Sequence, residues 1–419
     1  MSDLQRRWAK AKLNAAMPVF NELDEEGTGT GTGDESDSGT TTRSLSYSVT
    51  SETSDAVPSF PDDDSSSASS SSVSSTGTVI PSPARALFAR PLGIPSARTL
   101  DPIPWTTYFE RELLLPTPSS PTVSYHTYLT SPVGKGPLFV THHGAGSSGL
   151  SFAVLSSEIR KRLPTAGILS PDCRGHGSTI APEDPLDLSL DTLSEDLYRV
   201  IMLTRDAMKW KELPPVMLVG HSLGGAVVTD LAKKGLLGGA LLGYAVLDVV
   251  EGSAMDALTS MQTYLSTRPV GFGSLREGID WHVRSRTLRS SVAARTSVPA
   301  LLMLEEGDGE RPWRWRTDLA RTQPFWEGWF VGLSKKFLEA KGGKMLLLAG
   351  TDRLDTELTI GQMQGKYALQ VFPEAGHFIH EDLPEKTAVA LVDFYRRNDR
   401  SALVLPPKVS ELLAQGKKV

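Results

Sequence analysis

Ser222 is the residue whose surroundings in this sequence most directly predict chemistry. It lies in the pattern G-H-S-L-G at 220–224, which follows an apolar run at 215–219 and precedes a helix-like segment at 226–234. A serine on a sharp strand-to-helix turn exposes its hydroxyl, and small flanking residues allow the chain to turn so tightly. The sequence therefore predicts a serine nucleophile and a serine hydrolase.

His377 is the predicted general base. A serine hydroxyl needs a base within hydrogen-bond reach, and for a nucleophile on such a turn the chain order is serine, acid, histidine. His377 follows the last strand-like run, and the preceding Gly376 favours a tight, exposed turn. His380 is the nearby competitor. The two histidines do not predict a metal site, because no third ligand has a convincing spacing.

Two aspartates compete for the role of the acid that orients the histidine and stabilises the imidazolium. Asp248 ends the strand-like run that follows the nucleophile helix, and Asp352 ends the next one. The usual placement of the acid after the penultimate strand slightly favours Asp352. The sequence pattern by itself leaves both open.

Two backbone N–H groups are expected to stabilise the oxyanion. One belongs to Leu223, directly after the nucleophile. The other belongs to Gly144 or Ala145, in the glycine-containing loop at 140–146 that follows an early strand-like run. A second glycine-containing segment, D-C-R-G-H-G at 172–177, is interpreted as a structural marker, and its Cys173 as a structural thiol.

Alternating apolar runs and amphipathic segments supply the elements that would position these residues. This alternation predicts an α/β fold with a mostly parallel central sheet covered by helices on both faces. The predicted strands are 122–129, 138–142, 167–171, 216–221, 241–248, 345–350 and 368–372, and the predicted helices include 152–162, 193–210, 224–233 and 384–397.

The chain divides into three predicted parts. Residues 1–103 are a Ser-, Gly- and Thr-rich disordered leader with a Pro-rich approach, 104–400 form the hydrolase domain, and 401–419 form a tail. Within the domain, 253–337 is helical in character and rich in Trp and Arg, which predicts a cap insertion over the active site. The simpler interpretation, that these aromatic residues only pack the cap on the core, is slightly favoured. The segment at 305–312 is expected to be its mobile loop.

The composition of the chain disfavours nucleic-acid binding and excludes a disulfide-rich fold. The formal net charge of −6 offers no basic footprint for nucleic acid. The single cysteine rules out an intramolecular disulfide framework and fits a reducing compartment.

No apolar stretch approaches the roughly 20 residues that span a bilayer. Basic residues at 6–12 would suit a mitochondrial presequence, but Asp3 and the acidic residues from Glu22 onward disfavour one. We expect a cytoplasmic or nuclear protein.

Several long strings resemble the protein phosphatase methylesterase family, within the α/β-hydrolase fold. They are LDVVEGSAMDAL at 247–258, FWEGWFVGLS at 325–334, LLAGTDRLD at 347–355, LTIGQMQGK at 358–366 and GHFIHED at 376–382. The resemblance covers about residues 104–397.

The resemblance implies an enzyme that removes the methyl ester from the C-terminal leucine carboxylate of the type-2A protein phosphatase catalytic subunit, without a cofactor. It implies Ser222 as nucleophile, His377 as base and Asp248 as acid. The segment before Trp313 is shorter than in animal members of the family, so regulatory-subunit contacts that depend on that loop are not expected here. A general small-molecule serine esterase and a non-catalytic phosphatase-binding protein are the competing hypotheses.

Overall fold

The structure is a computed structural model of the full chain that describes residues 99–117, 120–182, 186–307, 309–350, 354–399 and 401. The predicted leader up to residue 98 and the predicted tail after Ser401 lie outside these residues. In the described part of the chain, every helix is too short or too polar to span a membrane.

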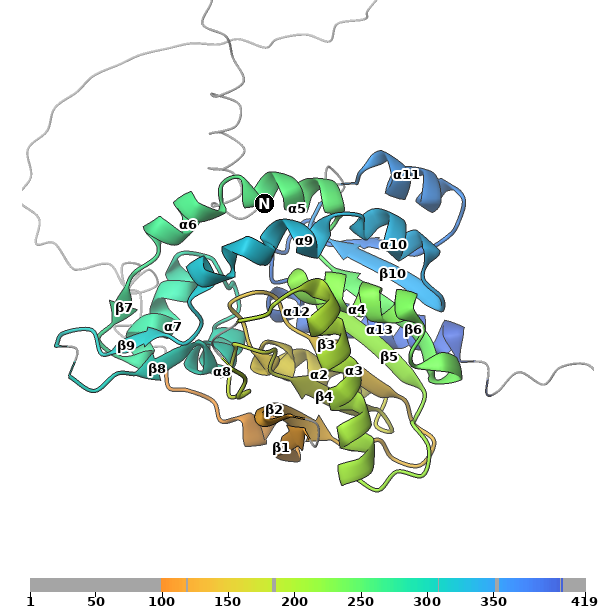
Figure 1. The fold of residues 1–419 in the computed structure, drawn as a ribbon, viewed down its shortest axis with the longest axis horizontal. Coiled ribbons are helices and arrows are strands. Elements are labelled where there is room, and N and C mark those ends of the chain that lie inside the picture. The colour runs from red at the N-terminus through yellow and green to blue at the C-terminus, as the bar shows by residue number, and fades with distance from the viewer. Residues whose placement is uncertain are drawn as a thin grey trace, which may run out of the picture. The chain divides into compact units, whose positions relative to one another are not determined.

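The central element is a mixed sheet of eight strands in the order β1-β2-β4-β3-β5-β6-β10-β11 (Figure 1). Its strands are β1 (Arg111–Thr117), β2 (Ser120–Thr130), β3 (Leu138–His142), β4 (Gly167–Pro171), β5 (Val216–His221), β6 (Leu241–Leu247), β10 (Gly343–Leu348) and β11 (Ala368–Val371). The pairs β1·β2 and β2·β4 are antiparallel, and every pair from β4 to β11 is parallel. The predicted fold class is confirmed, whereas β1 was not predicted.

Continuous burial explains why the central strands form where the sequence predicts them. Every residue of β3, β4 and β5 is buried. Parallel strands covered on both faces require such unbroken apolar runs, in contrast to the alternation seen in half-exposed strands. The three strands therefore begin and end at the predicted residues.

Helices cover both faces of this sheet (Figure 1). The helices α3 (Leu190–Ala207) and α4 (Leu223–Lys234) contribute to one hydrophobic core, and α2 (Ala153–Arg162) and α13 (Pro384–Asn398) contribute to the other. Helix α3 begins three residues before the predicted start, because the Ser189 hydroxyl caps it by accepting the Thr192 N–H at 3.4 Å.

The segment between β6 and β10 holds short helices and an antiparallel sheet of three strands in the order β7-β9-β8. Its elements are α5 (Glu251–Leu258), α6 (Met261–Thr267), β7 (Gly271–Phe272), α7 (Leu275–Arg284), α8 (Ser291–Leu301), β8 (Leu302–Leu304), β9 (Trp313–Trp315), η5 (Leu319–Phe325), α9 (Trp326–Phe330) and α10 (Leu333–Glu339). We call this segment, 251–342, the insertion. The remaining elements are η2 (Trp105–Thr107), η3 (Gly149–Phe152), η4 (Gly238–Ala240), α11 (Thr356–Met363) and α12 (Ile379–Asp382).

The aromatic residues of the insertion have packing roles. Phe272 packs edge-on against Trp315, with ring centroids 5.5 Å apart, inside a small core that belongs to the insertion. Trp326 and Trp329 join the main core instead. The segment predicted to be mobile, 305–312, connects β8 to β9, and the Glu305 N–H donates to the Pro312 carbonyl at 2.8 Å. Its mobility stays a prediction.

Candidate active site

Ser222 lies on a strained turn between β5 and α4. Its φ of 53° and ψ of −121° are values that residues with a side chain rarely adopt. The turn closes because the flanking positions are glycine. A Cβ on Gly220 would lie 2.1 Å from the Gly224 carbonyl oxygen, and one on Gly224 would lie 2.0 Å from the His142 carbonyl oxygen. The predicted strand, turn and helix therefore surround the predicted nucleophile.

His377 and Asp248 form a hydrogen-bonded pair. The His377 Nδ1 lies 2.8 Å from the Asp248 Oδ2, with the carboxylate side chain fully buried and the imidazole side chain 41% exposed. An ionised carboxylate only accepts, so the pair places the proton on Nδ1 and leaves Nε2 as the acceptor. This is the tautomer that a general base for a serine hydroxyl requires.

Asp248 is fixed from the sheet side as well. It follows β6 with φ of 53°. Its N–H donates to the Leu347 carbonyl at 2.8 Å, and its Oδ1 accepts the Ala349 N–H at 2.9 Å. Asp352, the other candidate acid, lies outside the described residues. The hydrogen bond to His377 thus favours Asp248, against the slight preference from strand order.

His380 has surroundings unlike those of His377. It is fully buried and stacks on Phe152, with ring centroids 4.3 Å apart. In the described part of the chain neither of its ring nitrogens has a hydrogen-bond partner. Burial holds the pKa of His380 well below its ordinary value, so the ring is neutral. No group of three or more metal-ligating side chains gathers anywhere among the described residues.

The predicted oxyanion loop lies against the nucleophile. A Cβ on Gly144 would lie 3.1 Å from the Ser222 Cβ and 3.0 Å from the His221 Nδ1. Leu223 is the first residue of α4, and N–H groups in the first turn of a helix have no partner within that helix. Ala145 is half-buried beside Gly144. The predicted donor Leu223 and the two alternatives for the second donor, Gly144 and Ala145, therefore come from two segments that meet at Ser222.

Buried histidines hold the oxyanion loop, a role that sequence analysis did not assign. The His143 Nε2 accepts the Cys173 N–H at 2.9 Å, and the His176 Nε2 accepts the Gly146 N–H at 2.8 Å. Burial lowers the pKa of both imidazoles, which keeps the accepting nitrogens unprotonated. The insertion borders the same loop, because a Cβ on Gly146 would lie 2.8 Å from the Leu319 side chain of η5.

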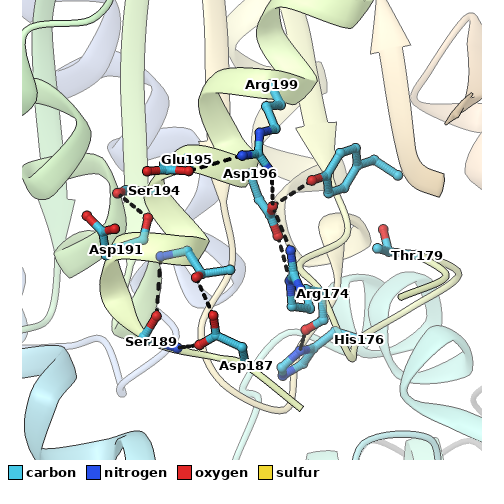
Figure 2. A network of polar contacts seen from close by, with 12 residues as sticks. Arg174, His176, Thr179, Asp187, Ser189, Asp191, Ser194, Glu195, Asp196 and Arg199 are labelled. Carbon is cyan, nitrogen blue, oxygen red and sulfur yellow. Dashed lines mark hydrogen bonds and ion pairs between the residues drawn. The ribbon is translucent and has the colours of Figure 1, made fainter. Parts of the chain in front are cut away.

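The segment 172–177 has the structural role that the sequence indicated. Its Arg174 binds Asp196 of α3 with two hydrogen bonds of 2.8 and 2.9 Å, and the Tyr125 hydroxyl donates to the same carboxylate at 2.5 Å. Figure 2 shows Arg174 and Arg199 on opposite sides of Asp196. Burial raises the pKa of the Cys173 thiol, which is uncharged and enclosed as a structural thiol would be. Asp196 was not singled out from the sequence.

Known proteins resemble this chain in sequence and in fold. Residues 138–390 match the model of the alpha/beta hydrolase family. The chain is 69% identical to protein phosphatase methylesterase 1 of Gibberella zeae and 64% identical to that of Neurospora crassa, in both cases over 100% of both chains. It is 46% identical to protein phosphatase methylesterase 1 of Schizosaccharomyces pombe over 73% of this chain and 87% of the relative.

Two solved structures show the same fold at low identity. One is E-2-(acetamidomethylene)succinate hydrolase, with a TM-score of 0.51 and 19% identity over 65% of this chain and 96% of the other. The second is a thioesterase domain from the curacin biosynthetic pathway, with a TM-score of 0.51 and 19% identity over 67% and 99%. This chain belongs to the protein phosphatase methylesterase 1 family, whose members are carboxylic ester hydrolases with the α/β-hydrolase fold.

Proposed function

We propose that this enzyme removes the methyl ester from the C-terminal leucine carboxylate of the type-2A protein phosphatase catalytic subunit. The observation that carries the proposal is the hydrogen-bonded pair of His377 and Asp248 in a chain that is 69% identical, over its full length, to a protein phosphatase methylesterase. The pair supplies a base for serine-based ester hydrolysis. The relatives' name supplies the class of substrate.

In this proposal the Ser222 Oγ attacks the carbonyl carbon of the methyl ester while His377 takes the hydroxyl proton at Nε2. The buried Asp248 carboxylate stabilises the imidazolium that forms. The N–H groups of Leu223 and of Gly144 or Ala145 stabilise the negative charge on the former carbonyl oxygen. His377 then protonates methoxide, which leaves as methanol.

The second half of the reaction releases the phosphatase. His377 takes a proton from water, and the resulting hydroxide attacks the acyl-enzyme ester at the same carbonyl carbon. Ser222 leaves with the proton that His377 returns, and the leucine carboxylate is free. The acyl group of the intermediate is the phosphatase's own C-terminus, so we expect the enzyme to accept a peptide tail presented by a folded partner, in the cytoplasm or the nucleus. No cofactor takes part.

Methanol release separates this proposal from its competitors. We would incubate carboxymethylated phosphatase catalytic subunit with the wild type and with Ser222→Ala, and assay a small acyl ester in parallel. The proposal predicts methanol from the phosphatase with the wild type and none above background with Ser222→Ala. Hydrolysis of the small ester alone would contradict the proposed substrate and favour a general esterase. Demethylation that survives Ser222→Ala would contradict the mechanism.

A further inference from the structure

The loop that carries His377 is held by its backbone on both sides of that residue. We call this segment, 372–378, the base loop. The Gly376 N–H donates to the Asp382 Oδ2 at 2.8 Å. The His221 Nε2–H donates to the His377 carbonyl at 2.9 Å, and His221 immediately precedes the nucleophile in the sequence. Burial lowers the pKa of His221 to about 3, so it stays neutral and keeps this donor arrangement.

Asp382 is a buried carboxylate that serves the backbone of two segments. Its side chain is only 1% exposed. Besides the Gly376 N–H, it accepts the Arg289 N–H on Oδ1 at 2.8 Å. Burial raises its pKa, and the two backbone hydrogen bonds and the Arg289 charge act against that rise. Burying a carboxyl group is costly unless hydrogen bonds compensate, and here each oxygen has one specific N–H partner.

Arg289 brings the insertion into contact with the base loop. It lies between α7 and α8, and its guanidinium donates to the Glu374 carbonyl. Its Nε lies 3.7 Å from the Asp382 Oδ2. A Cβ on Gly376 would lie 2.9 Å from the Asp382 Oδ2 and 3.5 Å from the Arg289 Nε, so the loop has no spare space at this point.

We infer that Asp382 and Arg289 are positioning residues for ester hydrolysis, which act by fixing the base loop and thus the place of the His377 imidazole. The ring of His377 is too exposed for packing alone to hold it. Its orientation depends on the Asp248 hydrogen bond and on the backbone that carries it. Displacing a catalytic group by about 1 Å can reduce a rate on the order of 100-fold. This inference rests on the proposed role of His377 as the base.

Glu381 offers a matched control for Asp382. It is the adjacent residue and is also buried, and its Oε2 lies 2.6 Å from the Ser297 Oγ of α8. Burial raises the pKa of the Glu381 carboxyl group well above its ordinary value. Glu381→Gln keeps the size and shape of this buried side chain and an oxygen that can accept from the Ser297 hydroxyl. Asp382→Asn, in contrast, replaces one of the two accepting oxygens by an NH2 group. That group then faces the backbone N–H of Gly376 or Arg289 and cannot accept a hydrogen bond from it.

The test measures how fast a fluorophosphonate labels Ser222, together with kcat and KM for p-nitrophenyl acetate. For Asp382→Asn we expect labelling and kcat to fall on the order of 100-fold while KM stays within about twofold. Arg289→Gln should lose about tenfold in both rates, because it removes only the guanidinium contacts. Glu381→Gln should keep the wild-type rates. A purely structural role would lower the melting temperature of the variants and leave kcat unchanged.

Arg289→Gln decides the question if Asp382→Asn does not fold, because the Arg289 side chain is 20% exposed and more tolerant of change. Wild-type labelling and kcat in a folded Asp382→Asn or Arg289→Gln variant, or an equal loss in Glu381→Gln, would overturn the inference. Labelling needs Ser222 and its base but no phosphatase. A wild type that is labelled yet releases no methanol from the phosphatase would therefore overturn the proposed substrate without touching this test.

Discussion

The sheet around Ser222 and the insertion position their side chains by different means. In the sheet, β3 and β5 are buried along their whole length, and Asp248 is tied through its N–H and its carboxylate to the backbone of Leu347 and Ala349, at the end of the neighbouring strand β10. In the insertion, strands of two or three residues and short helices surround a small core of their own. The comparison indicates that regular, continuous elements position Ser222 and Asp248, whereas the insertion relies on side-chain contacts between distant segments.

Replacing the base His377 should give the largest loss of activity and leave the fold intact. His377→Ala should lower kcat on the order of 10⁶-fold, because the nucleophile then has no proton acceptor. The melting temperature should not change, because the sheet holds the site without this side chain. The control is His380→Phe, which keeps an aromatic ring stacked on Phe152 and should retain most of the activity. Comparable losses in both variants would contradict the assignment of the base.

Acid should destabilise the sheet region more steeply than the insertion. Burial lowers the pKa of His142, His143, His176, His221 and His380 around the sheet, and of His282 in the insertion. The unfolded chain takes up these protons near pH 6.5 and the folded chain does not, so their stability contribution is complete above about pH 6.5 and is lost as the pH falls. Each of these histidines lowers the free energy of unfolding by at most about 1.4 kcal/mol per pH unit below about pH 6.5.

Urea unfolding at several pH values between about 7.5 and 5, combined with hydrogen exchange, tests this expectation. We expect amide protection in β3, β5 and α4 to fall faster with acid than protection in α7 and α8. A free energy of unfolding that is constant over this range would contradict the account.

Truncating one buried phenylalanine in each region should show whether the two regions unfold together. Phe139 in β3 is fully buried, and Phe272 in β7 is 1% exposed. Each change to Ala should cost about 3–5 kcal/mol. Phe139→Ala should lower the global free energy of unfolding, whereas Phe272→Ala should reduce amide protection in the insertion only. Loss of protection across β3 and β5 in Phe272→Ala would show that the small core around Phe272 does not unfold separately from the sheet.

His126 should give the smallest effect, with the opposite dependence on pH. Burial lowers its pKa, but the Asp172 carboxylate, 2.8 Å from its Nδ1, outweighs burial and raises the pKa above the ordinary value. Its contribution is therefore complete below about pH 6.5 and is lost as the pH rises through the folded-state pKa. The difference in free energy of unfolding between wild type and His126→Asn should shrink by at most about 1.4 kcal/mol per pH unit above pH 6.5. A difference that grows with pH would contradict this sign.

The central sheet could be predicted because each of its central strands is recognisable from its own residues. Residues 138–142, 167–171 and 216–221 are unbroken, mostly apolar runs and match β3, β4 and β5 to the residue. The small sheet was not predictable, since Gly271–Phe272 pairs with Trp313–Trp315 some forty residues away. Two or three residues are too few to show a period of two.

The parts of the candidate site that lie in a recognisable local sequence pattern could be predicted. Ser222 and the loop at 140–146 stand out by their glycines, and His377 by its place in the chain. The acid was ambiguous, because Asp248 and Asp352 follow neighbouring strands and only a hydrogen bond to His377 separates them. Asp196 and Asp382 were missed, because each binds an arginine from a distant segment, Arg174 for Asp196 and Arg289 for Asp382.

The most direct test compares methanol release from carboxymethylated phosphatase catalytic subunit by the wild type, Asp248→Asn and Asp352→Asn. We predict a loss in kcat on the order of 10⁴-fold for Asp248→Asn, because an amide at this place cannot hold the required imidazole tautomer. Asp352→Asn should stay close to the wild type. A large loss in Asp352→Asn with activity retained in Asp248→Asn would contradict the proposed site, and a wild type that releases no methanol would contradict the proposed function.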